Sequence, residues 1–223
     1  MPTTTTLAQQ VTSIVGSWTP SDFPEFYKDA FNYIADVIPT DSELWANANL
    51  SSTTSLSDVT STGEATFKIL KVINDNKPAK EISYEDYLVG QDANSIYYNA
   101  KNYNNPLWTR QPDGTIIIAP SGGSAVIYYW PYTTDEDFDS VASNLLTSTL
   151  NGFPDEARLP AIIKAGINIL YTKISDAVQE EEDGELLQML QAQMQQLQQW
   201  YTSEMNRLHI PDKTLGVEKG NLK

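Results

Sequence analysis

The chain has 223 residues, and its 29 Asp and Glu outnumber its 14 Lys and Arg, so the formal net charge is −15. Cysteine is absent and His209 is the single histidine, which excludes disulfides and thiolate chemistry and disfavours histidine-ligated zinc and histidine-based triads. The acidity argues against a general nucleic-acid binder, because phosphate contacts need clustered Lys and Arg. Composition therefore favours binding or assembly over catalysis, and we expect no enzyme activity, no cofactor and no metal.

Hydrophobic residues make up 40% of the chain, enough for the core of one large domain or two small ones. No apolar run reaches the ~18–20 residues of a membrane span. The first ten residues lack the basic and apolar regions of a secretory signal, so we expect neither a membrane anchor nor export.

Residues 1–45 predict two helices. Apolar residues recur at helical spacing from Leu7 to Trp18, and Thr19-Pro20 interrupts this pattern. Asp22 and Glu25 then resemble a capping box, and an aromatic stripe follows until Pro39.

Residues 46–134 predict a Tyr-rich β-domain that begins with a Ser/Thr/Asn-rich arm at 47–62. Alternation and β-branched residues predict strands at 65–73, 95–100, 115–119 and 125–130. The last two flank a Gly-rich turn and are expected to form a hairpin. Eight of the twelve tyrosines lie between residues 84 and 132; they indicate either a partner-binding face or simply the cover of a small sheet.

Residues 135–210 predict a connector with a short helix around 138–146, followed by two long helices. The first helix starts at Pro160 and the second runs from about Leu187 to Leu208, with apolar residues at steps of three and four. A short Gly-containing turn between them predicts an antiparallel αα-hairpin. Residues 211–223 are polar and are expected to form a flexible tail.

Two acidic motifs do not support a metal site. Asp135, Asp137 and Asp139 match the first ligand positions of a calcium loop, but Ser140 and Leu146 stand where Gly and Glu are needed. The carboxylates of residues 180–183 would point in different directions along a helix end. A hydrolase that uses a pair of carboxylates remains an alternative, although no particular pair is indicated.

Uncharged amides mark one side of the last helix. Between Leu186 and Trp200 there are few charges in an otherwise acidic chain, and amides hydrogen-bond across an interface without the desolvation cost of ions. This pattern indicates either an ordinary exposed face or a subunit contact, and the candidate interface residues are Gln188, Gln191, Gln195, Gln198 and Gln199.

Several short segments resemble the head–tail adaptor proteins of tailed bacteriophages. They are the motifs SNLLTS (143–148), FPD (153–155), LPAIIKA (159–165) and MNRL (205–208), and the strand VIYYWP (126–131) that precedes them. The resemblance covers roughly residues 60–210.

The resemblance implies an α+β, mainly α fold: a helical bundle with the C-terminal αα-hairpin and an inserted small antiparallel β-domain. It implies a virion protein of the head–tail neck, assembled in the host cytoplasm. About twelve copies would form a ring beneath the portal and continue the channel for double-stranded DNA, which passes without sequence-specific binding. Its partners would be further copies, the portal protein and a tail or neck protein.

The C-terminal tail is expected to order against the portal. The residues that we expect to bind there are Ile210, Pro211, Leu215, Val217 and Leu222. An alternative function is a Tyr-rich β binding module of a tail-fibre or receptor-binding protein, which would act through the predicted sheet.

Overall fold

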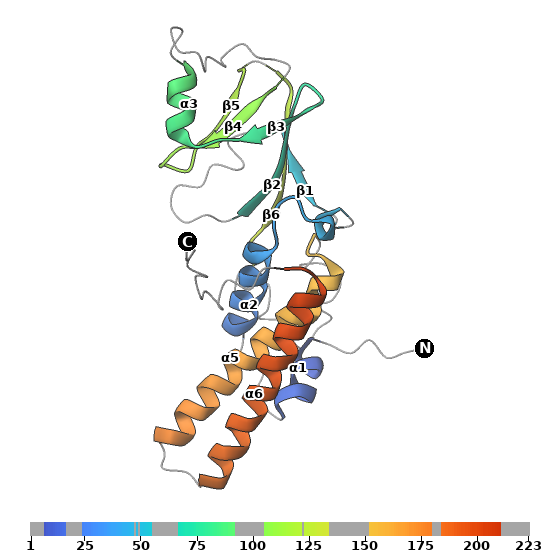
Figure 1. Ribbon diagram of the computed structural model, residues 1–223, viewed down its shortest axis with the longest axis vertical. Helices are drawn as coiled ribbons and strands as arrows, with labels where there is room; N and C mark the ends of the chain where they lie inside the picture. Colours follow the sequence, from blue (N-terminus) through green and yellow to red (C-terminus); the bar gives the residue numbers. More distant parts are fainter. Residues whose placement is uncertain are drawn as a thin grey trace, which may run out of the picture. The chain divides into compact units, whose positions relative to one another are not determined.

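The computed structural model of the protein describes residues 7–16, 24–46, 48, 50–54, 67–91, 105–121, 123–133, 152–179 and 184–210. The chain divides into two compact units (Figure 1). Residues 1–48 and 133–223 form one, the helical unit, and residues 49–132 form the other, the sheet unit.

The helical unit is built from both ends of the chain. Its described elements are α1 (Leu7–Val15), α2 (Pro24–Val37), the 3₁₀ helices η2 (Glu43–Trp45) and η4 (Asp155–Ala157), α5 (Arg158–Gln179) and α6 (Gly184–Arg207). The two N-terminal helices and the two long C-terminal helices that the periodicity predicts are confirmed. Helices α5 and α6 pack side by side (Figure 1). Within the described ranges, no helix is both long and apolar enough to cross a membrane.

Helix α2 supplies the aromatic side of the core. Pro24 is its first residue, where the missing N–H costs nothing, and Glu25 lies in the first turn beside the positive end of the helix dipole. One face is fully buried and packs against α5. The buried residues of this face are Tyr27, Ala30, Phe31 and Ile34, and Ile38 is buried directly after the helix. The Phe31 ring meets the Phe153 ring edge to face, with 4.9 Å between centroids.

Helix α1 comes close to α5 because residue 166 is glycine. A methyl group at Gly166 would lie 3.3 Å from Val15 Cγ1 and 3.6 Å from Leu197 Cδ1. The bare backbone therefore leaves room for α1 on one side and for α6 on the other.

A hydrogen-bonded clasp joins α2 to the point where the chain returns from the sheet unit. The Asn32 side chain accepts hydrogen bonds from the Thr133 backbone N–H (2.9 Å) and from its hydroxyl (2.9 Å), and it donates to the Thr133 carbonyl oxygen (3.1 Å). Thr133 is only 5% exposed, so all three of its polar groups depend on this one amide.

The sheet unit contains six strands and one described helix. They are β1 (Ser51–Thr53), β2 (Phe67–Asn74), β3 (Lys77–Glu81), α3 (Tyr84–Gln91), β4 (Leu107–Arg110), β5 (Ile116–Ala119) and β6 (Ala125–Pro131). The strand order is β1-β6-β2-β3-β4-β5. Neighbouring strands are antiparallel except for β3 and β4, which are parallel. One face buries a core of Phe67, Ile69, Val72, Trp108, Ile116, Ile118 and Ile127.

The fold class expected from the resemblance is wrong. The described chain has five α-helices and a six-stranded mixed sheet, not a helical bundle with a small antiparallel insert. Strands β3 and β4 and helix α3 account for the difference. Strand β3 is mostly exposed, so apolar and polar residues alternate only weakly in its sequence. Helix α3 has only one buried residue, so its sequence shows only weak helical periodicity.

The predicted hairpin of residues 115–119 and 125–130 is also wrong. Strand β5 pairs with β4, whereas β6 lies between β1 and β2. The β2–β3 turn holds the Gly-rich segment instead: Asn74 Nδ2 donates to the Pro120 carbonyl (3.1 Å), and the Ser124 N–H donates to Asp75 Oδ1 (2.8 Å). A hairpin does form between β2 and β3, with Asp75 and Asn76 at its turn. Both residues have positive φ, as a two-residue turn of this kind requires.

The other β-domain predictions have mixed outcomes. The strands predicted at 65–73, 115–119 and 125–130 are confirmed with shifted ends. The predicted arm contains strand β1, which pairs with β6. The strand predicted at 95–100 and the helix predicted around 138–146 lie outside the described residues.

We predict that Asn32→Ala lowers the free energy of unfolding by about 2–3 kcal/mol, because it leaves buried polar groups of Thr133 without partners. Thr133→Val is the matched control; it removes only the hydroxyl bond and should cost about 1 kcal/mol. Urea unfolding followed by circular dichroism gives both values. Equal losses for the two variants would contradict the role given to the amide.

We predict a pH dependence that originates at Tyr27. Burial raises the pKa of its hydroxyl above the usual value, so the unfolded chain releases this proton near pH 10, about its reference pKa, while the native chain keeps it. The contribution of the protonated Tyr27 hydroxyl to the free energy of unfolding is fully present below that pH, and it is lost as the pH rises further. Above about pH 10, the free energy of unfolding should therefore fall less steeply in Tyr27→Phe than in wild type, by at most ~1.4 kcal/mol per pH unit. Equal slopes for Tyr27→Phe and wild type would refute the assignment.

Candidate functional site

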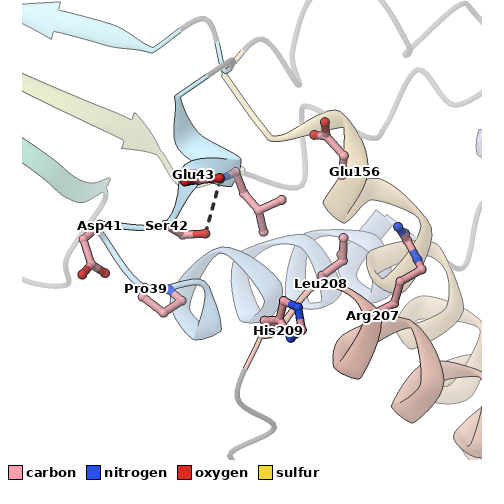
Figure 2. Close-up of a pocket in the computed structure, with 9 residues that line it drawn as sticks. Pro39, Asp41, Ser42, Glu43, Glu156, Arg207, Leu208 and His209 are labelled. Carbon is pink, nitrogen blue, oxygen red and sulfur yellow. Dashed lines mark hydrogen bonds between the residues drawn. The ribbon is translucent and has the colours of Figure 1, made fainter.

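A pocket of about 560 Å³ lies in the helical unit, at the C-terminal ends of α2 and α6 (Figure 2). The segment after α2 provides one side, Glu156 of η4 another, and the end of α6 the third. The lining residues are Pro39, Asp41, Ser42, Glu43, Leu44, Glu156, Arg207, Leu208 and His209.

The pocket is open and mainly anionic. Its three carboxylates, Asp41, Glu43 and Glu156, are exposed, and helix C-termini add negative partial charge. The Arg207 guanidinium is held beside Glu204, with Nε 2.8 Å from Oε2. Among the described residues, no group of three or more His, Asp or Glu side chains could hold a metal ion. The pocket is suited to weak contact with a cationic group.

The end of α6 explains where Ile210 lies. The Ile210 N–H donates to the Met205 carbonyl (3.0 Å) and the His209 N–H to the Asn206 carbonyl (3.1 Å). His209 has a φ of 54°, so these bonds form a Schellman cap, in which the residue after the left-handed one packs back on the helix. Ile210 is accordingly buried, as is Met205. The other four residues of the expected portal-binding tail, Pro211, Leu215, Val217 and Leu222, lie outside the described residues.

The structure places the five candidate glutamines on one face of α6. Gln188, Gln191, Gln195 and Gln199 are exposed, and Gln198 is half-buried. Their spacing of three and four residues keeps them on neighbouring turns of one side of the helix. The buried residues Leu190, Leu197, Tyr201 and Met205 define another side of α6.

Two apolar side chains of α5 extend this surface. Gln198 Nε2 lies 3.3 Å from the Tyr171 hydroxyl, to which it donates a hydrogen bond. Tyr171 is 53% exposed, and Val178, two turns further along α5, is 58% exposed. We refer to the five glutamines with Tyr171 and Val178 as the glutamine face. The sequence did not single out these two apolar residues, because their spacing alone does not distinguish them from the buried stripe of α5.

The remaining side of α6 holds α1 in place. Gln193 Nε2 donates to the Ile14 carbonyl (2.6 Å), and Lys173 Nζ of α5 donates to the Val15 carbonyl (3.3 Å). These side chains satisfy the last carbonyls of α1, which have no partner within their own helix, and the lysine also complements the helix dipole. Gln193 therefore has a structural role that the exposed glutamines do not share.

Charge is unevenly distributed along the chain. The helical unit has 8 Lys and Arg against 21 Asp and Glu, a net charge of −13, whereas the sheet unit has 6 against 8, a net charge of −2. No charged residue occurs between Glu185 and Glu204. The glutamine face is thus an uncharged surface on the strongly acidic unit.

We predict that Gln193→Ala lowers the free energy of unfolding by about 1 kcal/mol, because the Ile14 carbonyl loses its donor. Gln195→Ala, a matched change on the exposed side, should leave it within about 0.5 kcal/mol of wild type. Thermal and urea unfolding of the two variants measure the difference. A loss in Gln195→Ala as large as that in Gln193→Ala would contradict the division of α6 into two sides.

No family model matches the chain, and no curated protein matches it. Its function therefore has to be inferred from its own surfaces.

Proposed function

We propose that the protein is a structural component of a tailed-phage virion, a head–tail adaptor whose copies form a ring beneath the portal and extend the DNA channel toward the tail. The observation that carries this proposal is the glutamine face, an exposed and uncharged surface in a chain of net charge −15. The order of the elements, two helices, a sheet ending in a Tyr-Tyr strand and two long helices, supports it as well.

Copies that each carry a charge of −15 repel one another, and a contact surface without charges avoids adding like-charge pairs at close range. The glutamine face meets this condition between Glu185 and Glu204 of α6. Its amides donate and accept hydrogen bonds across an interface without the cost of desolvating ions. The exposed Tyr171 and Val178 add apolar area, which drives association.

A ring requires a contact between two different surfaces of neighbouring copies, repeated until it closes. The adaptor role implies about twelve copies, with the portal protein on one side and a tail or neck protein on the other. The acidity of the helical unit suits a channel through which double-stranded DNA slides without specific binding, because like charges keep the duplex from adhering. The proposed place of the protein is the neck of the virion, after assembly in the host cytoplasm.

The proposed contact with the portal belongs to the segment that begins at Pro211. Ile210 is not part of it, because its side chain is buried at the end of α6. A segment that folds only on its partner locks an assembly once the partner is present.

The triple variant Gln191→Glu, Gln195→Glu and Gln199→Glu tests the proposal. It places three like charges on the glutamine face of every copy, and we expect it to abolish ring assembly. The protein is mixed with the portal of its virion, and decorated portals are counted by negative-stain electron microscopy. Wild-type protein should form rings on the portal, and the triple variant should remain unbound and folded by circular dichroism.

The matched control carries the same three charges away from α6, at the exposed Val89, Gln91 and Ser121 of the sheet unit. Val89→Glu, Gln91→Glu and Ser121→Glu together should still permit rings. The proposal fails if wild-type protein never associates with a portal, or if both triple variants assemble equally well. A monomer that instead binds a carbohydrate or receptor through the sheet unit would favour the binding-module alternative.

A further inference from the structure

A row of hydrogen-bond donors crosses four strands of the sheet unit. Tyr128 of β6 pairs with Ser52 of β1 on one side and with Lys71 of β2 on the other. Val72 pairs with Ala79, the last pair of the β2–β3 ladder, and both face the core, so Lys71 and Lys80, one residue beyond this pair on each strand, lie on the opposite face. We call Ser52, Tyr128, Lys71 and Lys80 the lysine row; its strands lie together in Figure 1.

In the ranges that the structure describes, no carboxylate balances the two lysines of this row. Lys71 and Lys80 are both exposed, and neither forms an ion pair within the part of the chain that the structure describes. Like charges at neighbouring cross-strand positions repel and weaken the sheet. A bound anionic group would turn this repulsion into attraction, and the hydroxyls of Tyr128 and Ser52 provide further donors beside it.

The chain itself carries a matching acidic surface. Glu25, Asp29 and Asp36 are exposed on α2, and their spacing of four and seven residues puts them on one stripe of that helix. Carboxylates one turn apart have Cβ atoms about 5–6 Å apart, and neighbouring cross-strand positions have Cβ atoms about 4.5–5.5 Å apart. Two lysines of the sheet can therefore meet two acids of the helix at the same time.

We infer that the lysine row of one copy docks on the α2 acidic stripe of the next copy. This inference deepens the proposed ring and rests on it, because it adds to the glutamine face a contact between two different surfaces, which a closed head-to-tail ring needs. Charge complementarity selects a second copy: the helical unit has a net charge of −13 and the sheet unit has almost none. A duplex is disfavoured, since two exposed lysines offer far fewer phosphate contacts than the ~6–10 that DNA binding uses.

Charge exchange between copies tests the inference. Variant A carries Lys71→Glu and Lys80→Glu, and variant B carries Glu25→Lys and Asp29→Lys. Each alone juxtaposes like charges at the contact and should fail to form rings on the portal. In an equal mixture, the acidic sheet of A meets the basic helix of B and the basic sheet of B meets the acidic helix of A, so rings should return with alternating copies.

The control adds Glu85→Lys and Asp86→Lys, at exposed positions of α3, to variant A itself, which returns its net charge to the wild-type value but leaves two acidic surfaces facing each other. This combined variant alone should not form rings, and mass photometry with circular dichroism should show that every variant is folded. Formation of rings by this control would overturn the inference. Assembly of variant A alone at the wild-type level would also overturn it, but the proposed ring function would still stand. Failure of wild-type protein to assemble overturns both. If wild-type protein binds double-stranded DNA, and variant A loses that binding but not assembly, the row serves nucleic acid and the inference is wrong.

Discussion

The bonds between Asn32 and Thr133 are the constraint on which the helical unit depends. That unit consists of two stretches of chain separated by the whole sheet unit, and the partners of this clasp are 101 residues apart in sequence. Because one amide satisfies three polar groups of Thr133, the returning chain is fixed against α2 at this point. The position of α2 against α5 then follows from the packing of Phe31 and its neighbours.

The two long helices combine an internal role with an external one. Toward α1, they provide the space at Gly166 and the donors Lys173 and Gln193. On another side they present amides, Tyr171 and Val178. Substitutions on one side should leave the other unaffected, because distant sites with no shared partner usually act independently. This separation allows a rigid scaffold to carry a surface free to adapt to a neighbouring copy.

Periodicity in the sequence is sufficient to predict four of the helices, because α1, α2, α5 and α6 bury continuous apolar stripes. The sheet is less predictable. The Gly-rich segment after β5 resembles a hairpin turn, but its pairing depends on Asn74 and Asp75, which are distant in sequence and contact it through side chains. The amides of the glutamine face can be identified from their spacing, whereas Tyr171 and Val178 cannot, since an apolar residue on a long helix is normally assigned to the core. Gln193 looks like its neighbours in the sequence and differs only through its contact with Ile14.

The interrupted layout of the helical unit also determines the order in which the protein matures on the ribosome. The sheet unit is one uninterrupted segment, so it has all its strands once residue 131 has emerged. Helices α1 and α2 are synthesised first, yet they bury their apolar sides against α5, which emerges more than a hundred residues later. Until then the apolar sides of both helices have no native cover, and such transiently uncovered surface is open to misassociation and to chaperones. The first segments to be made thus complete their packing last, and the nascent middle of the chain folds before its two ends meet.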